Sequence, residues 1–332
     1  MRFPEFHGEW EEHGLSEYLD FKNGLNPDSK RFGKGIKFIS VMDILNNPVI
    51  TYDCIRASVQ ATDAEMSSFS VENGDILFQR SSETLEDVGR ANVYIDDKVA
   101  VFGGFVIRGK KKANYNPLFF RYLLSSPYAR KRIIPMGAGA QHFNIGQEGL
   151  SKVLLNFPSI EEQTKIASLL HLLDERIATQ SKLIEDLKKL KSAIIDYAIN
   201  SLDTDFAKFG SLYEMAGEGG TPTTSNASFY DNGNIPFIKI DDLKQKYLTE
   251  NKDFITELGL QKSSAWLVPT HSILFSNGAT IGEISITTYP VCTKQGILGI
   301  VPKQNIDVEF LYYFMSSSYF KKQLGVLLQK VQ

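Results

Sequence analysis

Three blocks of sequence occur twice in this chain of 332 residues, in the same order and at nearly the same separation. The block "IKFISVMDI" (36–44) matches "IPFIKIDDL" (235–243), "GDILFQR" (74–80) matches "HSILFSN" (271–277), and "FFRYLLSSPYARKRI" (119–133) matches "LYYFMSSSYFKKQ" (311–323). An internal duplication constrains architecture more strongly than any single motif. The chain is therefore predicted to contain two similar domains.

Each copy contains short runs of β-branched and aromatic residues that are typical of strands. Asn73-Gly74 in the first copy and Asn277-Gly278 in the second predict turns, and each copy closes with a helical segment. The expected fold class is α+β, with two similar mixed α/β domains.

A long helix is predicted between the copies. It begins after Phe157-Pro158, where Ser159 and Glu162 have the spacing of a capping box. The helix should run from Ser159 to about Asn200, which is about 60 Å at 1.5 Å per residue. The expected boundaries are domain 1 at 1–157, the helix at 158–200 and domain 2 at 201–332.

The apolar positions of this segment step alternately by four and three residues, a spacing typical of a coiled coil or an antiparallel helix pair. So wide an apolar face requires a partner. The residues expected to pair with another helix or to dock a partner are Ile166, Leu170, Leu173, Ile177, Ile184, Leu187 and Ile194.

Composition narrows the function. The net charge of −3 excludes nucleic-acid binding by bulk electrostatics, so any such binding must depend on local patches. Cys54 and Cys292 are far apart and have no metal-ligand spacing, which favours a reducing cytoplasm. No apolar run reaches the roughly 20 residues of a membrane span, and the first residues lack a signal peptide.

Catalytic motifs are not found. "NYNPLF" (114–119) has a weak likeness to the N-P-P-F/Y loop of amino-methyltransferases, but a helix capped by Asn116 with Pro117 in its first turn fits better. "GAGAQHFNIG" (137–146) lacks the P-loop lysine. No Ser-His-Asp set or metal-ligand spacing is evident, so the chain is predicted not to be an enzyme and to bind no metal or cofactor.

Polar loops with local positive charge follow strands in both copies. Arginine, asparagine and serine read base edges, and lysines contact phosphates, although a solvated turn has a similar composition. The expected DNA-binding residues are Lys30, Arg31, Lys34, Lys37, Arg80, Ser81, Ser82 and Arg90 in the first copy, and Thr221, Thr223, Lys239, Ser276, Asn277 and Thr280 in the second.

Three stretches together resemble the specificity (S) subunit of type I restriction–modification systems. They are "GGTPTTSNASFYDNGNIPFIKIDDL" (219–243), "ILFSNGATIGEISI" (273–286) and "GAGAQHFNIGQEGLSKVLLNFPSIEEQTKIASLL" (137–170). The entry to the helix at Glu162, Gln163 and Ile166 is the most specific part of the resemblance. The first copy is more divergent, with "KNGLNPDSKRFGKG" (22–35) in place of the G-G-T-P of residues 219–222.

This resemblance implies a DNA-recognition subunit without an active site, in which each domain reads one half of a split, asymmetric target. It further implies that S-adenosylmethionine, ATP and Mg²⁺ bind to partner subunits. The partners would be double-stranded DNA, modification (methyltransferase) subunits and a restriction subunit. Two other functions remain open: a helical scaffold that does not bind DNA, and the recognition part of a single-chain restriction–methyltransferase.

The second copy ends early relative to the first, because residues 325–332 align with 134–141. In full-length family members a second long helix follows and pairs antiparallel with the first. Without it the apolar stripe would be exposed. We therefore expect a homodimer through the long helix, or a complex in which a modification subunit covers it.

Overall fold

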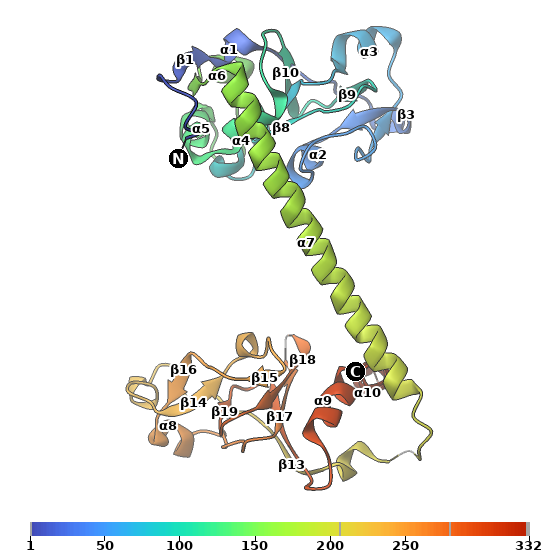
Figure 1. Cartoon of the computed structure of the whole chain (residues 1–332), viewed down its shortest axis with the longest axis vertical. Helices are drawn as coiled ribbons and strands as arrows, with labels where there is room; N and C mark the ends of the chain where they lie inside the picture. Colours follow the sequence, from blue (N-terminus) through green and yellow to red (C-terminus); the bar gives the residue numbers. More distant parts are fainter. Residues whose placement is uncertain (1, 206, 279, 330–332) are drawn as a thin grey trace. The chain divides into compact units, whose positions relative to one another are not determined.

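A computed structural model describes residues 2–205, 207–278 and 280–329, with side chains to Leu324. The chain divides into two compact units, Met1–Thr179 (unit 1) and Gln180–Gln332 (unit 2). Both contain strands and helices, and a single helix, α7 (Ile160–Asn200), joins them (Figure 1). The predicted α+β class with a long intervening helix is confirmed.

Unit 1 is built from short strands and helices, and only α7 is long. Its elements are β1 (Glu11–Gly14), α1 (Leu15–Tyr18), β2 (Leu19–Asn23), β3 (Phe32–Ile39), α2 (Val41–Asn46), β4 (Ser58–Val59), α3 (Asp63–Phe69), β5 (Ser70–Val71), β6 (Ile76–Gln79), β7 (Ser81–Ser82), β8 (Ala91–Val93), β9 (Ala100–Phe102), β10 (Val106–Lys111), α4 (Pro117–Ser125), α5 (Pro127–Ile133), β11 (Phe143–Asn144), α6 (Gln147–Ser151) and β12 (Leu154–Phe157).

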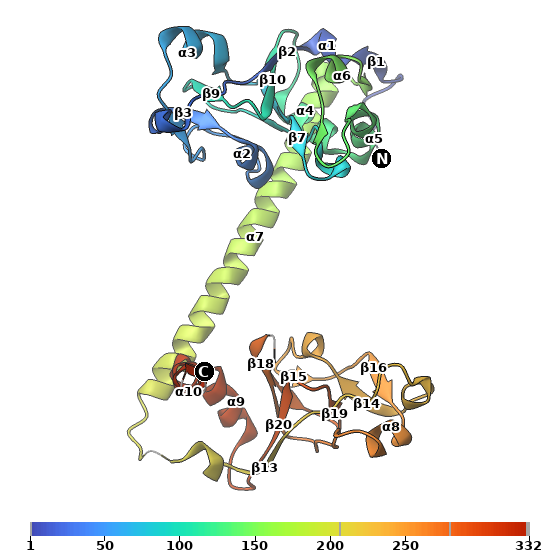
Figure 2. The same cartoon turned by 180° about the vertical axis from the view of Figure 1, so that it is seen from behind.

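Two four-stranded sheets organise unit 1. One has the antiparallel order β2-β10-β6-β8, and the other has the order β4-β3-β9-β5 with β3 and β9 parallel. Helices α4, α5 and α6 lie on one side of β10, and α2 and α3 lie on the other side (Figure 2). Successive side chains of a strand point to opposite faces of the sheet. The adjacent residues Leu77 and Phe78 of β6 therefore enter different apolar clusters, and both are fully buried.

Helix α4 begins as the sequence predicts. The Asn116 side chain accepts a hydrogen bond from the Phe119 N–H at 3.0 Å, and Pro117 occupies the first turn. Four orphan backbone donors at a helix start favour this arrangement. The interpretation of "NYNPLF" as a helix start is confirmed.

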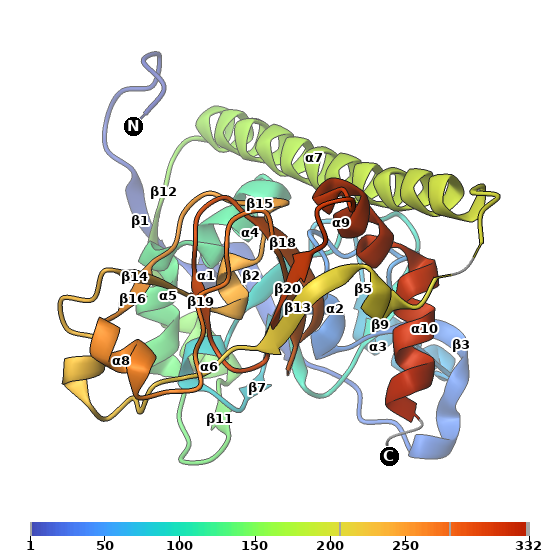
Figure 3. The same cartoon turned by 90° about the horizontal axis from the view of Figure 1, so that it is seen from below.

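Unit 2 contains the remaining elements. They are β13 (Tyr213–Glu218), β14 (Ile235–Ile238), β15 (Tyr247–Leu248), β16 (Asp253–Ile255), α8 (Glu257–Gln261), β17 (Ile273–Asn277), β18 (Ile281–Thr287), β19 (Cys292–Thr293), β20 (Ile297–Pro302), α9 (Val308–Ser316) and α10 (Ser318–Gln329). Figure 3 shows α9 and α10 as consecutive helices that meet at a corner.

Unit 2 repeats the topology of unit 1. Its larger sheet runs β13-β20-β17-β18-β15, so its first four strands correspond in order to β2-β10-β6-β8. The second sheet has a parallel pair in each unit, with Phe38 opposite Val101 in unit 1 and Phe237 opposite Cys292 in unit 2. Phe38 and Phe237 therefore occupy equivalent positions in the two units, as the duplication predicts.

The start of α7 differs from the predicted capping box in one respect. The Ser159 hydroxyl accepts the Glu162 N–H at 3.3 Å, as expected. The Glu162 carboxylate instead accepts hydrogen bonds from the Arg2 side chain, at 2.8 and 2.6 Å, and lies 3.4 Å from the indole N–H of Trp10. Glu162 is buried, so its role is to hold the N-terminal segment against α7.

Two details limit the comparison of the units. Helix α10 continues to Gln329, whereas α5 ends at Ile133. The end of the expected correspondence, residues 330–332, lies outside the described residues. Within the described ranges, no helix has both the length and the apolar character needed to cross a membrane.

Candidate nucleic-acid interface

The turn between β9 and β10 forms the centre of a loop cluster in unit 1. The Arg80 N–H donates to the Phe105 carbonyl at 2.9 Å. The Arg80 guanidinium donates to the Gly104 carbonyl at 3.3 Å. Arg80 therefore holds this turn in place, and its side chain is partly exposed.

The segment after β2 crosses this turn at very short range. The Gly24 N–H donates to the Val106 carbonyl at 3.2 Å. A Cβ atom on Gly24 would lie only 2.1 Å from the Gly103 carbonyl oxygen, so no other residue fits at this crossing. The crossing places Asn26 and Pro27 beside the turn.

A cavity of about 630 Å³ lies among these loops. Its apolar lining includes Phe32, Phe38, Met42 and Phe105, and its polar lining includes Asn26, Ser40, Ser81, Ser82 and His142. Met42 and Phe105 are 61% and 68% exposed. The cavity thus combines hydroxyl and amide groups with exposed apolar side chains. Of these residues, the sequence predictions included only Ser81 and Ser82.

Unit 2 uses the same hydrogen-bonded frame with different side chains. The Asn277 N–H donates to the Gly296 carbonyl at 2.9 Å, as Arg80 does to Phe105. The Gly219 N–H donates to the Ile297 carbonyl at 2.8 Å, as Gly24 does to Val106. "GLNP" (24–27) therefore occupies the place of "GGTP" (219–222), which narrows the expected replacement by residues 22–35 to these four positions.

Polar groups complete the frame in unit 2. The Thr221 hydroxyl accepts the Gln295 N–H at 3.2 Å, and the Glu218 carboxylate accepts the Gly296 N–H at 3.1 Å. Asn277, Thr223 and Thr280 are exposed, so they can reach a ligand. Lys239 is also exposed, and its ammonium forms an ion pair with Asp253 at 2.8 Å.

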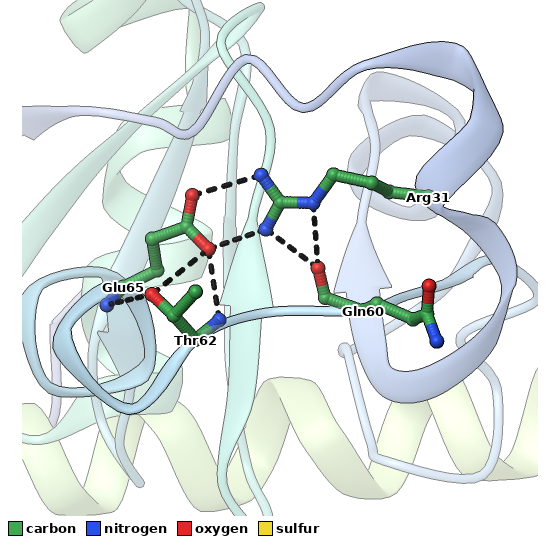
Figure 4. Close-up of polar contacts among 4 residues, drawn as sticks. All are labelled: Arg31, Gln60, Thr62 and Glu65. Carbon is green, nitrogen blue, oxygen red and sulfur yellow. Dashed lines mark hydrogen bonds and ion pairs between the residues drawn. The ribbon is translucent and has the colours of Figure 1, made fainter.

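The basic segment 30–37 divides into free and engaged side chains. Lys30 and Lys34 are exposed. The Arg31 guanidinium binds both the Glu65 carboxylate and the Gln60 carbonyl (Figure 4). The Lys37 ammonium donates to the Ile55 carbonyl at 2.6 Å. Arg31 and Lys37 thus have structural partners within the unit.

The ion pair of Arg31 has an electrostatic consequence. The Arg31 guanidinium, followed by the Thr62 N–H, lowers the pKa of Glu65 to about 2. The Thr62 side chain also caps α3. The Glu65 carboxylate therefore fastens Arg31 to α3.

One of the residues predicted to contact DNA, Ser276, is inaccessible in the structure. Ser276 is completely buried, and its hydroxyl oxygen accepts the Glu283 N–H at 2.8 Å. Strand β17 lies between β20 and β18, with apolar clusters on both faces. Ser276 is therefore a structural residue, and the expectation that it contacts DNA is wrong.

The remaining predicted residues of unit 1 are partly engaged. The Ser81 hydroxyl donates to the Asn144 side chain, and the Ser82 hydroxyl accepts the Thr84 N–H at 3.2 Å. Arg90 forms an ion pair with Asp87 at 2.6 Å, and more than half of its side-chain surface is exposed. Arg90 remains accessible.

A second cavity in unit 1, of about 440 Å³, brings three arginines together. Arg90, Arg121 and Arg130 line it, and the sequence analysis named only Arg90. Burial, and then the charge of Arg90, lower the pKa of Arg130. Arg130 holds the loop before β8 through the Glu86 and Val88 carbonyls, at 2.9 and 2.6 Å.

The apolar stripe on α7 is open to solvent over most of its length. Leu173, Ile177, Ile184, Leu187 and Ile194 are all at least 50% exposed. Ile166 packs against the core of unit 1, and Leu170 is partly buried. In unit 2, the exposed face borders an apolar groove of about 610 Å³ shared with Phe310 and Tyr313 of α9.

Metal ligands are not clustered in the described ranges. No group of three or more His, Cys, Asp or Glu side chains there could hold a metal ion. What the two units present instead is paired loop clusters on a common frame, joined by a helix with an exposed apolar stripe. These features define a class of duplicated two-domain proteins with a long intervening helix.

Comparisons with known proteins identify this class. The model of the family described as "Type I restriction modification DNA specificity domain" matches residues 7–189 and 203–331. The chain belongs to this family. The predicted resemblance to type I specificity subunits is thereby confirmed, and with it the prediction of a non-catalytic subunit.

Individual relatives have low sequence identity to this chain or match only part of it. The type I restriction enzyme HindI specificity subunit of Haemophilus influenzae is 22% identical, over 95% of this chain and 84% of that protein. The MjaIX specificity subunit of Methanocaldococcus jannaschii is 32% identical over 37% of this chain and 28% of that protein.

Solved structures show the same fold. The S subunit of a type I restriction–modification system from M. genitalium has a TM-score of 0.56 at 16% identity, covering 99% of this chain and 83% of that one. A chain from a study of complex assembly and conformational transition of the type I R-M system has a TM-score of 0.52 at 14% identity, covering 94% and 80%.

Proposed function

We propose that this chain recognises a bipartite, asymmetric DNA sequence, with unit 1 reading one half and unit 2 the other. The observation that carries the proposal is the shared frame with different side chains. Arg80 and Phe105 in unit 1 stand where Asn277 and Gly296 stand in unit 2. Readers with one scaffold and different side chains select different base edges.

In this proposal α7 acts as a spacer and a docking element. A helix of 41 residues measures about 60 Å, which is longer than one turn of B-DNA, ~34 Å. The helix is therefore long enough to separate two half-sites that lie on the same side of the duplex. A rigid helix holds two readers at a set separation better than a flexible linker does. The exposed stripe that includes Leu173 and Leu187 supports docking of a modification subunit.

Partner subunits would supply the chemistry. Methyl transfer to adenine from S-adenosylmethionine, and cleavage driven by ATP and Mg²⁺, would belong to the modification and restriction subunits. The complex-assembly structure similar to this chain supports such partners. This chain would contribute DNA binding and positioning only.

The decisive experiment is to map the adenines that become methylated in DNA exposed to this chain with its modification partner. We expect two short, different half-sites separated by a stretch without sequence preference. A single continuous or palindromic site would contradict the proposal. Tight binding of S-adenosylmethionine by the isolated chain would favour a single-chain methyltransferase, and failure to bind any duplex at low salt would favour a scaffold.

A further inference from the structure

Phe105 is a large apolar side chain that is held outside the core. It is 68% exposed, at the turn between β9 and β10. Its carbonyl accepts the Arg80 N–H at 2.9 Å, and the neighbouring Gly104 carbonyl accepts the Arg80 guanidinium at 3.3 Å. Arg80 therefore holds the backbone at Phe105 through two hydrogen bonds. An aromatic ring at a fixed and exposed position is suited to contact with a ligand.

The surroundings of Phe105 continue this apolar character. Met42, in the first turn of α2, is 61% exposed and lines the same cavity. Phe32, 41% exposed, also lines it. Asn26 and Ser40 add polar groups to the cavity wall. The cavity wall therefore pairs an apolar surface with hydrogen-bonding groups.

The fold itself does not require an aromatic residue at this position. Gly296 occupies the same place in unit 2, where its carbonyl accepts the Asn277 N–H as the Phe105 carbonyl accepts that of Arg80. Gly296 has a positive φ of 89°, so the unit 2 turn is made without any side chain. Phe105 is thus an addition to a frame that forms without it.

We propose that Phe105, with Met42, contacts the C5-methyl group of a thymine in the half-site read by unit 1. The proposal rests on the DNA recognition proposed above. Among the base edges exposed in the major groove, thymine alone presents a methyl group, and phenylalanine is one of the side chains that contacts it. Asn26 lines the same cavity and supplies an amide for hydrogen bonds to neighbouring base edges, whereas the Ser40 hydroxyl donates to the Asp43 carboxylate. Unit 2, with glycine at this position, has no such contact.

The test uses the full chain and two duplexes that contain the target found by methylation mapping. One duplex is unmodified, and the other has deoxyuridine in place of every thymidine of the unit 1 half-site, which removes only the methyl groups. The wild-type chain should bind the deoxyuridine duplex about four- to tenfold more weakly, the value for one buried methyl group. Phe105→Ala should bind the unmodified duplex more weakly and show a smaller further loss on deoxyuridine substitution, and the double variant Phe105→Ala/Met42→Ala should show no further loss.

Controls separate this contact from other effects. Phe105→Leu keeps an apolar side chain and should retain part of the discrimination. Phe254→Ala removes an exposed ring in unit 2 (41% against 68% for Phe105) and should leave discrimination intact. Equal losses on both duplexes from Phe105→Ala, a wild-type chain indifferent to deoxyuridine, or a unit 1 half-site without thymine would each overturn the proposal.

The outcome is distinct from failure of DNA recognition itself. If the chain did not recognise DNA, the wild type would bind neither duplex better than random sequence. If only the Phe105 contact is wrong, the wild type still prefers its target, and Phe105→Ala binds that target with the same affinity as the wild type. An increase in 2-aminopurine fluorescence at the half-site, dependent on Phe105 and independent of deoxyuridine, would show a wedge between bases and would also overturn the methyl contact.

Discussion

Arg80 and Asn277 occupy the same position in the two units, because each donates its backbone N–H at 2.9 Å to the carbonyl at the tip of the neighbouring turn. The backbone geometry at this position is therefore shared. The side chains differ in charge, length and hydrogen-bonding pattern. This position is where the two units have the same structure and different chemistry.

Arg80→Ala and Asn277→Ala should each weaken binding to the methylation target by about 1–3 kcal/mol, the range for a base-edge contact. Binding to random duplex should change little. Competition titrations with target and random DNA measure both values. Equal losses on both duplexes would show that the residue does not contact base edges.

Lys30→Ala or Lys34→Ala should weaken binding to all duplexes alike. Both lysines are exposed, and a lysine on a phosphate adds about one unit to the salt dependence of binding. The slope of log affinity against log salt should therefore become shallower. An unchanged slope would place these lysines away from the DNA backbone.

Arg31→Ala should instead lower the thermal stability of unit 1, because its guanidinium binds Glu65 and the Gln60 carbonyl. The folded-state pKa of Glu65, about 2, is below the ordinary value near 4.3. The ion pair therefore stabilises the fold at pH values above about 4.3, and this stabilisation is lost as the pH falls towards 2. Melting curves from pH 7 to 2.5 should show the difference between wild type and Arg31→Ala shrinking below about pH 4.3.

Glu162→Gln should loosen the N-terminal segment from α7. Hydrogen bonds from Arg2, and then from Trp10, lower the pKa of the Glu162 carboxyl. Its stabilising contribution is therefore present above the unfolded value near 4.3 and lost as pH falls through the lower folded value. Hydrogen exchange of residues 2–10 should rise in the variant at pH 7. If wild type and variant exchange equally, the Arg2–Glu162 pair does not hold the segment.

Leu173→Asp or Leu187→Asp should abolish assembly with the modification subunit, because a charge cannot be buried unpaired in an apolar helix interface. Both side chains are at least half exposed in this chain, so each variant should keep units 1 and 2 folded, as judged by circular dichroism. Lys188→Asp, on the polar face, is the matched control and should assemble.

Without a modification subunit, sedimentation equilibrium at micromolar concentration should show a wild-type homodimer and a Leu187→Asp monomer.

The duplication and the long helix could be predicted because their signals are periodic in sequence. The pairing of Phe38 with Phe237 follows from aligned apolar blocks, and α7 follows from heptad spacing. Both depend on which residues are apolar and how far apart they are. Long-range partners have no such local signal.

The site was less predictable for that reason. Arg31 reads as a free cation in sequence, and only the tertiary fold brings it to Glu65. Ser276 follows a strand pattern that suggests alternate exposure, yet β17 is covered on both faces, so its hydroxyl is internal. Phe105 is hydrophobic and would be assigned to a core, whereas a tight turn holds it outside.

Gly24 and Gly219 have a consequence for how such a chain can change over time. A Cβ atom at either residue would lie 2.1 or 2.3 Å from a backbone carbonyl oxygen of the crossing turn, so substitution there is blocked in both units. The neighbouring positions 26, 80 and 105, and the counterparts 221 and 277 in unit 2, carry no such steric limit at the crossing, whereas the positive φ of Gly296 favours glycine at that one position. Mutations can therefore accumulate at the reading positions while the crossing stays intact, and a lineage can acquire a new target sequence without passing through an unfolded intermediate.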